Sequence, residues 1–390
     1  MAELKGYLRS DGRKGIRNIV AVAYLVECSK FVANRIVSPF ELNSDTEGRV
    51  HEVGFPGCYP NAHAEKILSQ LAMHPNVGAV LLISLGCESM NRERIEKRIL
   101  ESGRPAASIG IQEVGGTEKA IELGRLWVTN ILEEMRTVPL VPMSISELSV
   151  ATICGGSDGT SGVTANPAVG VAFDTLVDAG ATCVFEETGE LIGCEKDMAA
   201  RAINEQVSQA LIASVEKAAR FYQVLGFASF APGNADGGLS TIEEKSLGAY
   251  NKSGTRPIQG ILAPGETPIQ PGLWLLDVVP DGEVRFGFPN IADNAEITEL
   301  IASGAHIILF TTGRGSVVGS AISPVIKICA NPETYSRMES DMDINAGKIL
   351  QGCSLEEVGS EIVNAILDVA SGHKSKSESL GHRECLITYK

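Results

Sequence analysis

The sequence predicts an α/β protein of two domains, with mainly parallel, Rossmann-like sheets flanked by helices. Apolar runs of strand length alternate with helical patterns along most of the chain, which is the order that builds parallel sheets. The 390 residues exceed the size of one typical domain. The proline-containing stretch 137–142 is the best linker candidate, so we expect domains at 1–138 and 139–390. Prolines concentrated at 251–272 favour a subdivision of the second domain there.

In the first domain, each apolar run is followed by a helical pattern. The continuous apolar run at 19–26 is typical of a buried parallel strand. The expected strands are 19–26, 50–53, 77–85 and 107–111, and the expected helices are 27–37, 62–73, 92–102 and 117–136.

The second domain repeats this alternation. A helix is expected to begin near Asn166 and Pro167, with Asn166 as its N-cap. The Ser/Lys-rich stretch 371–379 is expected to be mobile. The expected strands are 150–153, 182–185, 274–279 and 306–310, and the other expected helices are 196–224, 242–248 and 295–302.

Composition excludes several classes of partner. The net charge of −15 argues against nucleic acid and anionic membranes, because both require basic patches. No apolar run reaches the roughly 18–20 residues of a membrane span, and the N-terminus has no signal-peptide pattern. We therefore expect a cytoplasmic protein whose nine cysteines are free or metal-bound rather than paired.

The stretch 148–170 holds the strongest local signal. A strand-length run ends in a loop with four glycines, and a helical pattern follows. Ligands of open α/β sheets bind at loops of this kind. A plain glycine-rich turn is the alternative, but a turn needs fewer hydroxyl groups than this loop contains. The candidate binding residues of the loop are Ser157, Asp158, Ser161, Thr164 and Asn166.

Four cysteines follow expected strands or their turns. Because parallel strands present their carboxyl ends at one edge, these thiols can converge on iron, an iron–sulfur cluster or zinc. The alternative is that they are small buried hydrophobic residues, since the chain has no CxxC pair. The four are Cys28, Cys58, Cys87 and Cys154, and Glu88 beside Cys87 is a further ligand candidate.

Candidate bases and anion-binding groups also follow strands. Burial of one carboxylate of the Glu186-Glu187 pair would raise its pKa towards that of a useful base, although a solvated pair is equally compatible with the sequence. His51 is another candidate base. One stretch after an expected strand combines hydroxyls, backbone N–H groups and a guanidinium, which together suit a carboxylate, phosphate or sulfonate. Its residues are Thr311, Thr312, Arg314 and Ser316.

Two motif-like patterns are weak. The glycines around Arg314 lack GxGxxG spacing and occur late in the chain, so an NAD-linked oxidoreductase is only a remote alternative. The stretch 341–345 begins like a calcium loop, but Ala346 replaces the required glycine and Gly352 the required glutamate. A non-catalytic anion-binding or assembly subunit is the second rival interpretation.

Several collinear motifs resemble the altronate/galactarate dehydratase family over most of the chain. They include DGR near Asp11, GCE at 86–88 and GGT at 115–117. Others are CGGSD at 154–158, TANP at 164–167, GN at 233–234, EKSLG at 244–248, TTGRGS at 311–316 and DMDIN at 341–345.

The resemblance implies an iron-dependent lyase acting on a 2-hydroxy carboxylate. A base removes the proton on C2, the β substituent leaves C3, and the enol becomes a keto acid. Glu187, His51 or Lys245 would be the base, and the four cysteines would collectively bind Fe²⁺ or a cluster. Arg314 and its neighbouring hydroxyls would hold one anionic end of the substrate, and Arg13 and Arg17 the other. Asn234 joins the expected binding residues through its motif.

Two departures from the family pattern guide the choice of substrate. Sugar-acid dehydratases of the family usually carry an extra N-terminal domain of about a hundred residues, which here would be a separate small partner subunit or absent. The segment 277–296 also differs from the sugar-acid pattern. The lead expectation is therefore a two-subunit branch that eliminates bisulfite from sulfolactate, within an oligomer. Sugar-acid dehydration is the alternative.

Overall fold

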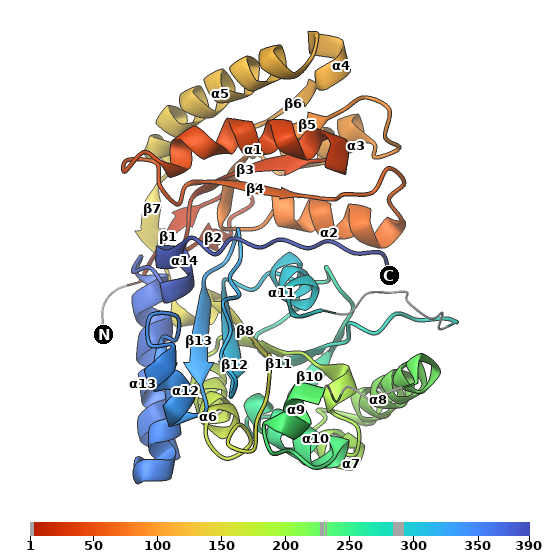
Figure 1. The fold of residues 1–390 in the computed structure, drawn as a ribbon, viewed down its shortest axis with the longest axis vertical. Helices are drawn as coiled ribbons and strands as arrows, with labels where there is room; N and C mark the ends of the chain where they lie inside the picture. Colours follow the sequence, from red (N-terminus) through yellow and green to blue (C-terminus); the bar gives the residue numbers. More distant parts are fainter. Residues whose placement is uncertain (1–3, 227–229, 231, 284–291) are drawn as a thin grey trace.

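The computed structural model describes residues 4–226, 230, 232–283 and 292–390. Two α/β units lie one above the other, the N-terminal unit in red to yellow and the C-terminal unit in green to blue (Figure 1). Each has its own parallel sheet, which confirms the expected fold class.

The N-terminal sheet has four parallel strands in the order β4-β3-β5-β6. Its central strands β3 and β5 are buried throughout because they are apolar on both faces. Laterally, Tyr24 of β3 pairs with Gly54 of β4 and with Ile83 of β5. The elements are β3 (Ile19–Tyr24), α1 (Glu27–Glu41), β4 (Val50–Gly54), α2 (Ala62–Ala72), β5 (Val77–Ser84), α3 (Arg92–Glu101), β6 (Ala106–Gly110), α4 (Ile111–Val114) and α5 (Thr117–Glu134).

The C-terminal sheet has seven parallel strands in the order β10-β11-β9-β8-β12-β13-β14. From β8 the chain adds β9, β10 and β11 on one side, with β11 between β9 and the edge strand β10, and from β12 it adds β13 and β14 on the other side; the strand order therefore reverses between β8 and β12. The strands are β8 (Ser149–Cys154), β9 (Thr182–Phe185), β10 (Ile258–Leu262), β11 (Gly272–Leu276), β12 (Ile307–Thr312), β13 (Val325–Cys329) and β14 (Ile344–Asn345).

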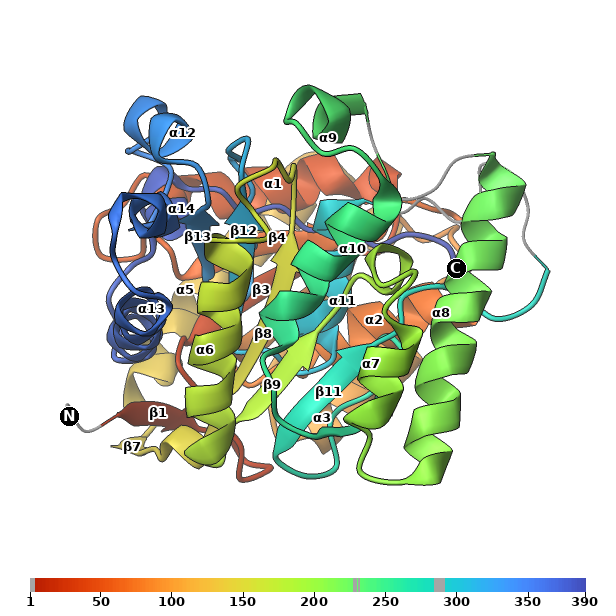
Figure 2. The same cartoon turned by 90° about the horizontal axis from the view of Figure 1, so that it is seen from below.

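Helices cover both faces of this sheet. Seen from below, α6, α7, α8 and α10 lie in front of it (Figure 2). On the other face α11 packs against α2 of the N-terminal unit, and one hydrophobic core there includes Leu71 and Leu300 from the two units. The helices are α6 (Ala165–Asp178), α7 (Glu195–Ala200), α8 (Glu205–Leu225), α9 (Pro232–Asp236), α10 (Ile242–Tyr250), α11 (Asp293–Ala302), α12 (Pro332–Arg337), α13 (Leu355–Ala370) and α14 (Lys376–Leu380).

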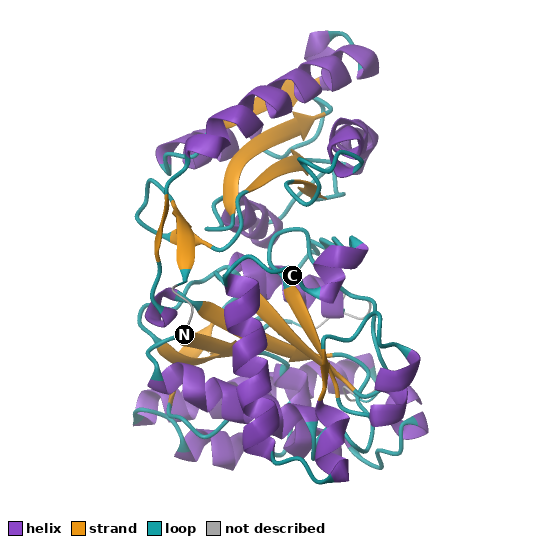
Figure 3. Ribbon diagram, turned by 90° about the vertical axis from the view of Figure 1, so that its left-hand side faces the viewer, coloured by secondary structure: helices purple, strands orange, loops and turns teal. Residues whose placement is uncertain are grey.

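A third, small antiparallel sheet joins the two units (Figure 3). It consists of β1 (Lys5–Leu8), β2 (Lys14–Gly15) and β7 (Leu140–Pro142), in the order β2-β1-β7. The expected linker is therefore partly a strand. Its two prolines are compatible with pairing because β7 lies at an edge, where an N–H group is not required from every residue.

Two other expectations about helices were wrong. The single helix expected at 196–224 is two helices, because the chain turns at 201–204 before Asn204 caps α8. The stretch 371–379 is not an irregular tail, because it contains the start of α14. Ser375 and Glu378 form a capping box there, and this arrangement satisfies backbone N–H groups of the helix start. Within the described part of the chain, no helix is long and apolar enough to cross a membrane.

Candidate active site at the carboxyl edge of the seven-stranded sheet

The reversal of strand order between β8 and β12 creates the crevice in which ligands of open α/β sheets bind. Cys154 ends β8, Thr312 ends β12, and Glu187 follows β9 on the opposite side of β8. These three chain positions are far apart in sequence, yet they meet at one edge because the strands are parallel and adjacent.

Glu187 is at the centre of this edge. It is the one described non-glycine residue in the left-handed region, with φ of 92°, which turns the chain sharply out of β9. Its Oε1 accepts a hydrogen bond of 2.5 Å from the backbone N–H of Cys154, and its Oε2 is ion-paired with Lys252. The side chain is only 6% exposed. The carboxylate is therefore fixed from two sides and shielded from water.

The environment gives Glu187 an unusual acidity. Burial and the nearby Glu190 carboxylate raise the pKa of Glu187 to about 7, although the ammonium group of Lys252 opposes this shift. A carboxyl with a pKa near 7 exchanges protons at neutral pH, as a general base must. Sequence reasoning predicted this role for Glu187, and it remains a prediction about catalysis.

A second ion pair lies beside the first. Lys245 from α10 pairs with Oε1 of Glu190, and the Cys154 thiol donates to Oε2 of Glu190 at 3.1 Å. Burial and the carboxylate of Glu187 raise the pKa of the Cys154 thiol well above its ordinary value. Cys154 is thus a neutral hydrogen-bond donor in the network.

The ligand atoms of Cys154, Glu187 and Glu190 all lie within 4.8 Å of one another, close enough for a single metal ion. Their charges argue against that use. Lys252 and Lys245 already neutralise the two carboxylates, so a divalent cation would have to displace two buried ammonium groups. The donor set fits proton transfer better than it fits a metal.

The glycine loop after β8 is organised around Asp158. Its Oδ1 accepts hydrogen bonds from Thr160 and Ser161, and its Oδ2 accepts one from the Asn331 amide. Gly313 approaches so closely that an added Cβ would lie 2.2 Å from Oδ1 of Asp158. This contact holds the loops after β8 and β12 together.

Two cavities flank Asp158. The first, of about 330 Å³, lies between the glycine loop and α10, and is lined by Ser157, Ser161, Asn166 and Lys245. The second, of about 400 Å³, is lined by Arg314 and Arg337. Its two guanidinium groups are of the kind that bind carboxylates and sulfonates in a fork, although Asp158 and Asp236 also line this cavity.

Other predicted binding residues hold the loops in place. The Asn166 side chain does not cap α6, since its Oδ1 accepts from the Thr311 hydroxyl at 2.8 Å and the N-cap is Thr164. Thr164 donates to the carbonyl of Ala330, and Thr312 to that of Gly156. Likewise, the amide of Asn234 donates to the carbonyl of Ser157, and Ser316 accepts from the N–H of Val318.

Three predicted site residues lie elsewhere. Arg17 pairs with Glu378 and bonds to three carbonyls, so it ties the two ends of the chain together. Arg13 pairs with Asp11 near the surface. His51 in β4 bonds to the carbonyl of Ala321, and burial lowers its pKa to about 4. These three residues thus make contacts within or between the two units and do not lie at the carboxyl edge of the seven-stranded sheet.

The expectation that four cysteines converge was wrong for one of them. Cys154 ends a strand of the C-terminal sheet, whereas Cys28, Cys58 and Cys87 follow strands of the N-terminal sheet. The carboxylate of Glu88 folds back and accepts from the N–H of Gly86 at 2.8 Å. The Glu88 side chain therefore stabilises the turn that connects it to Gly86.

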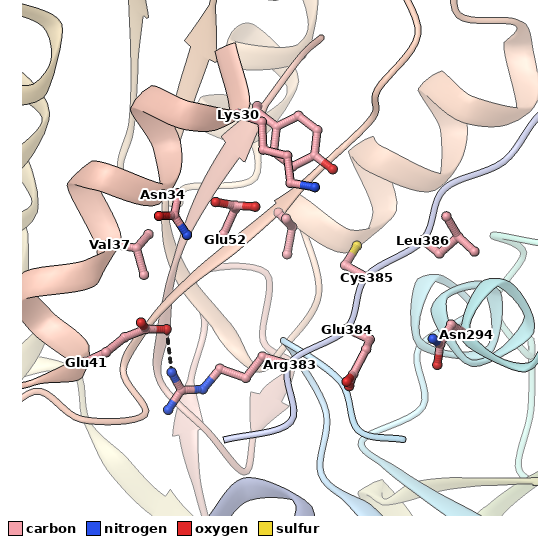
Figure 4. A pocket seen from close by; sticks show the side chains of 12 residues that line it. Lys30, Asn34, Val37, Glu41, Glu52, Asn294, Arg383, Glu384, Cys385 and Leu386 are labelled. Atoms are coloured by element: carbon pink, nitrogen blue, oxygen red, sulfur yellow. Dashed lines mark hydrogen bonds and ion pairs between the residues drawn. The ribbon is translucent and has the colours of Figure 1, made fainter. Parts of the chain in front are cut away.

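A cavity of about 430 Å³ lies between the two units, bounded by α1, β4, Asn294 and the segment 383–386 (Figure 4). Its arginine, Arg383, is paired with Glu41 across the cavity wall. The remaining charged side chains include Lys30 and Glu52. Its one arginine is already ion-paired with a carboxylate, whereas the cavity at Arg314 is lined by two arginines; both cavities also contain carboxylates.

Sequence reasoning missed several residues of the active-site network. Glu190 follows Glu187 at helical spacing, and this EETGE pattern is a signal that could have indicated a shared site. Lys252 and Glu296 had no comparable signal, because each comes from a segment distant in sequence. Glu186, 1% exposed, has two carboxylate oxygens without a hydrogen-bond partner among the described residues, and burial raises its pKa strongly.

The fold is α/β, and the buried acid–base network makes the carboxyl edge of the seven-stranded parallel sheet the candidate active site. Residues 145–390 match the family described as D-galactarate/altronate dehydratase, C-terminal. Residues 6–136 match D-galactarate dehydratase/altronate hydrolase, second domain. The chain belongs to the D-galactarate/altronate dehydratase family and is an enzyme of the lyase class.

Similar proteins cover nearly the whole chain. The (2R)-sulfolactate sulfo-lyase subunit beta of Chromohalobacter salexigens is 33% identical over 98% of this chain and 96% of its own length. The galactarate dehydratase (L-threo-forming) of Escherichia coli is 33% identical over 95% of this chain and 73% of its own length. The altronate dehydratase of Bacillus subtilis is 30% identical over 98% and 77%, respectively.

Proposed function

We propose that the chain catalyses β-elimination from (2R)-sulfolactate to give pyruvate and bisulfite, as the large subunit of an enzyme with a small partner subunit. The observation that carries the proposal is the buried Glu187, whose pKa of about 7 comes from its surroundings at the carboxyl edge of the sheet. Dehydration of altronate or galactarate is the second candidate, since relatives with those names are similar along almost all of this chain.

In the proposed reaction, ionised Glu187 takes the proton from C2 of the substrate. The electron pair of that C–H bond forms the C2–C3 double bond, and the C3–S bond breaks with its electrons leaving on sulfite. The resulting enol of pyruvate takes a proton at C3 and becomes the keto acid. Lys252 stays protonated throughout and stabilises the Glu187 carboxylate before it accepts the proton.

The anionic ends of the substrate need counter-charges, because the whole protein is acidic. Arg314 and Arg337 in one cavity supply guanidinium groups for the sulfonate or carboxylate. Ser157, Ser161 and Lys245 in the adjoining cavity supply hydroxyl and ammonium donors. Asp158 lines both cavities, so it separates the two subsites of the proposed substrate.

Iron is part of the proposal. Bound iron would supply Lewis-acid stabilisation for the negative charge that develops beside the substrate carboxylate. The charge-balanced group of Cys154, Glu187 and Glu190 is a poor host for it, as argued above. The thiols of Cys28, Cys58 and Cys87 are free, exposed and of a ligand type that iron–sulfur clusters accept.

One argument favours sulfolactate. The similar sulfo-lyase chain is named as a subunit beta and is covered over 96% of its length, which supports a small partner for this chain. Percentage identity does not separate the substrates, because the galactarate dehydratase is also 33% identical. Residues 284–291 of the divergent 277–296 segment lie outside the described residues.

The test is an anaerobic assay with iron and reductant that offers sulfolactate, altronate and galactarate separately, with and without a candidate small subunit. Sulfite released in step with pyruvate supports the proposal. A 2-keto-3-deoxy acid without sulfite overturns the choice of sulfolactate and supports dehydration. Binding of anions without turnover of any substrate, when iron and the small subunit are both present, overturns the assignment of catalysis to this chain.

A further inference from the structure

Three cysteines occupy equivalent positions in the N-terminal sheet. Tyr24, Gly54 and Ile83 are lateral neighbours in adjacent strands. Cys28, Cys58 and Cys87 each follow one of these three residues by four positions. The chain therefore brings a thiol to the carboxyl edge of this sheet from each of β3, β4 and β5.

The loops that carry these thiols are hydrogen-bonded to one another. The N–H of Glu27, next to Cys28, donates to the carbonyl of Pro56 in the second loop at 3.0 Å. The hydroxyl of Ser29 donates to the carbonyl of Ile83 in the third strand at 2.9 Å. Ser89 in the third loop donates to the carbonyl of Cys58 from both its N–H and its hydroxyl. Each loop is thus joined to both of the others or to their strands.

Two further contacts fix the loops. Gly57, beside Cys58, lies so close to the C-terminal segment that an added Cβ would be 2.1 Å from the hydroxyl of Tyr389. In the third loop, Oε2 of Glu88 accepts a hydrogen bond from the N–H of Gly86 at 2.8 Å and fixes the backbone before Cys87. Oε1 of Glu88 is buried and has no hydrogen-bond partner among the described residues.

The spacing of the thiols argues against a single metal ion held by all three. All three cysteines are free and exposed, and their sulfur atoms do not all lie within 4.8 Å of one another. One tetrahedral ion with bonds of about 2.3 Å would require sulfur atoms about 3.8 Å apart. A four-iron cube is wider, and it takes one thiolate on each iron.

We propose that Cys28, Cys58 and Cys87 bind a [4Fe–4S] cluster through three of its irons and leave the fourth iron open for an oxygen ligand of the substrate. The proposal rests on the iron dependence included in the proposed function and specifies its form and place. Cys28 lies in the first turn of α1, whose positive end favours the negative charge of a thiolate-bound cluster.

The cluster edge is connected to the acid–base network. Asn61, in the loop that carries Cys58, donates to the carbonyl of Lys390 at 2.7 Å. The ammonium group of Lys390 pairs with Glu299 of α11 at 2.6 Å. Helix α11 also carries Glu296, whose charge interacts with that of Glu187. The C-terminal segment crosses between the two units and links the edges (Figure 1).

The first experiment is reconstitution of the full chain with iron, sulfide and dithiothreitol under anaerobic conditions, followed by iron and acid-labile sulfide analysis. Four irons and four sulfides per chain are expected, with loss of at least three quarters of both in each of Cys28→Ser, Cys58→Ser and Cys87→Ser. Cys154→Ser and Cys353→Ser are the matched controls and should keep the full content. One iron without sulfide, or an intact cluster in any of the three variants, overturns the proposal.

Protection from alkylation keeps the test independent of variant folding. In the wild-type chain, reconstitution should protect Cys28, Cys58 and Cys87 from iodoacetamide at least tenfold, while the partly exposed Cys353 is modified equally in both forms. Equal labelling of the three cysteines before and after reconstitution contradicts the proposal.

A separate measurement tests whether the fourth iron binds the substrate. After one-electron reduction by dithionite, the electron paramagnetic resonance signal of the cluster should shift when sulfolactate or galactarate is added. A signal unchanged by every 2-hydroxy acid overturns the open iron. An intact cluster without turnover would instead contradict the proposed function, so the two failures are distinguishable.

Discussion

At the carboxyl edge of the four-stranded sheet, Cys28, Cys58 and Cys87 are exposed, whereas at the corresponding edge of the seven-stranded sheet Cys154 is buried among two glutamates and two lysines. Both edges arise from the same βα alternation. The exposed edge presents soft ligands that an incoming group can reach. The buried edge instead holds charges that control one another's protonation. Equivalent places in two similar sheets thus support different chemistry because burial differs.

The largest effect should come from Glu187→Gln, which removes the proposed base and keeps the size of the side chain. Loss of general base catalysis should lower kcat about 10²- to 10⁴-fold, measured as keto acid release. The iron and sulfide content should stay unchanged, because the proposed cluster ligands follow strands of the other sheet. A kcat within threefold of wild type would show that Glu187 is not the base.

Lys252→Met tests the interdependence of the buried charges. The substitution leaves the Glu187 carboxylate without its ion-pair partner and should lower the free energy of unfolding by about 3 kcal/mol in urea denaturation. The double variant Glu187→Gln/Lys252→Met should recover part of this loss. Cys58→Ser at the exposed edge should change the unfolding free energy of the apo chain by less than about 0.5 kcal/mol. Equal losses at the two edges would remove the contrast between them.

Arg314→Ala should weaken binding of the anionic substrate. A charge-assisted hydrogen bond contributes about 1.5–3 kcal/mol, so KM should rise about 10- to 100-fold with a smaller change in kcat. Arg13→Ala is the matched control, because Arg13 pairs with Asp11 near the surface. Similar KM increases in both variants would place the anion site elsewhere.

Glu296→Gln should alter the pH dependence of stability. Burial raises the pKa of Glu296 to about 8, so the folded chain holds a proton that the unfolded chain releases near pH 4.5. The unfolding free energy therefore falls as the pH rises from about 4.5 to about 8. The variant should be more stable than wild type at pH 9, by up to about 5 kcal/mol for a shift of this size, and nearly equal to it at pH 4. Urea denaturation of both proteins at the two pH values measures this difference. The same difference in unfolding free energy between variant and wild type at both pH values would contradict the prediction.

The smallest expected effect concerns the acid limb of the pH–rate profile. In wild type, kcat/KM should rise with a pKa of about 7 as Glu187 ionises. Glu190→Gln removes the neighbouring negative charge and should move this limb down by up to about one pH unit. Glu205→Gln, at the exposed start of α8, is the control. An unchanged limb in Glu190→Gln would assign the titration to another group.

Much of the scaffold was predictable because its strands are strong local signals. The apolar runs that become β3, β5 and β8 are short and uninterrupted, and the expected bounds differ from the observed ones by a few residues at most. Asn166 shows where local reasoning fails. The Asn-Pro pair is a good helix-start signal, but the hydroxyl of Thr311, distant in sequence, takes the amide oxygen for a tertiary contact.

The site was only partly predictable for the same physical reason. Glu187 follows a strand, so its place at the edge could be inferred. Lys252 becomes its partner only because the turn after α10 packs against the end of β9. Cys154 was grouped with the other cysteines because each follows a strand, and only the division into two sheets separates them.

The left-handed backbone at Glu187 has a consequence for variation of the sequence. A residue with a side chain costs about 1–3 kcal/mol in this conformation, and glycine avoids most of that cost. A library of random variants sorted for heat resistance should therefore enrich glycine at position 187 only together with an apolar residue at 252, because glycine alone would leave the buried Lys252 ammonium group without its partner. The same library sorted for turnover should retain glutamate. Selection for stability and selection for activity would then favour different residues at position 187.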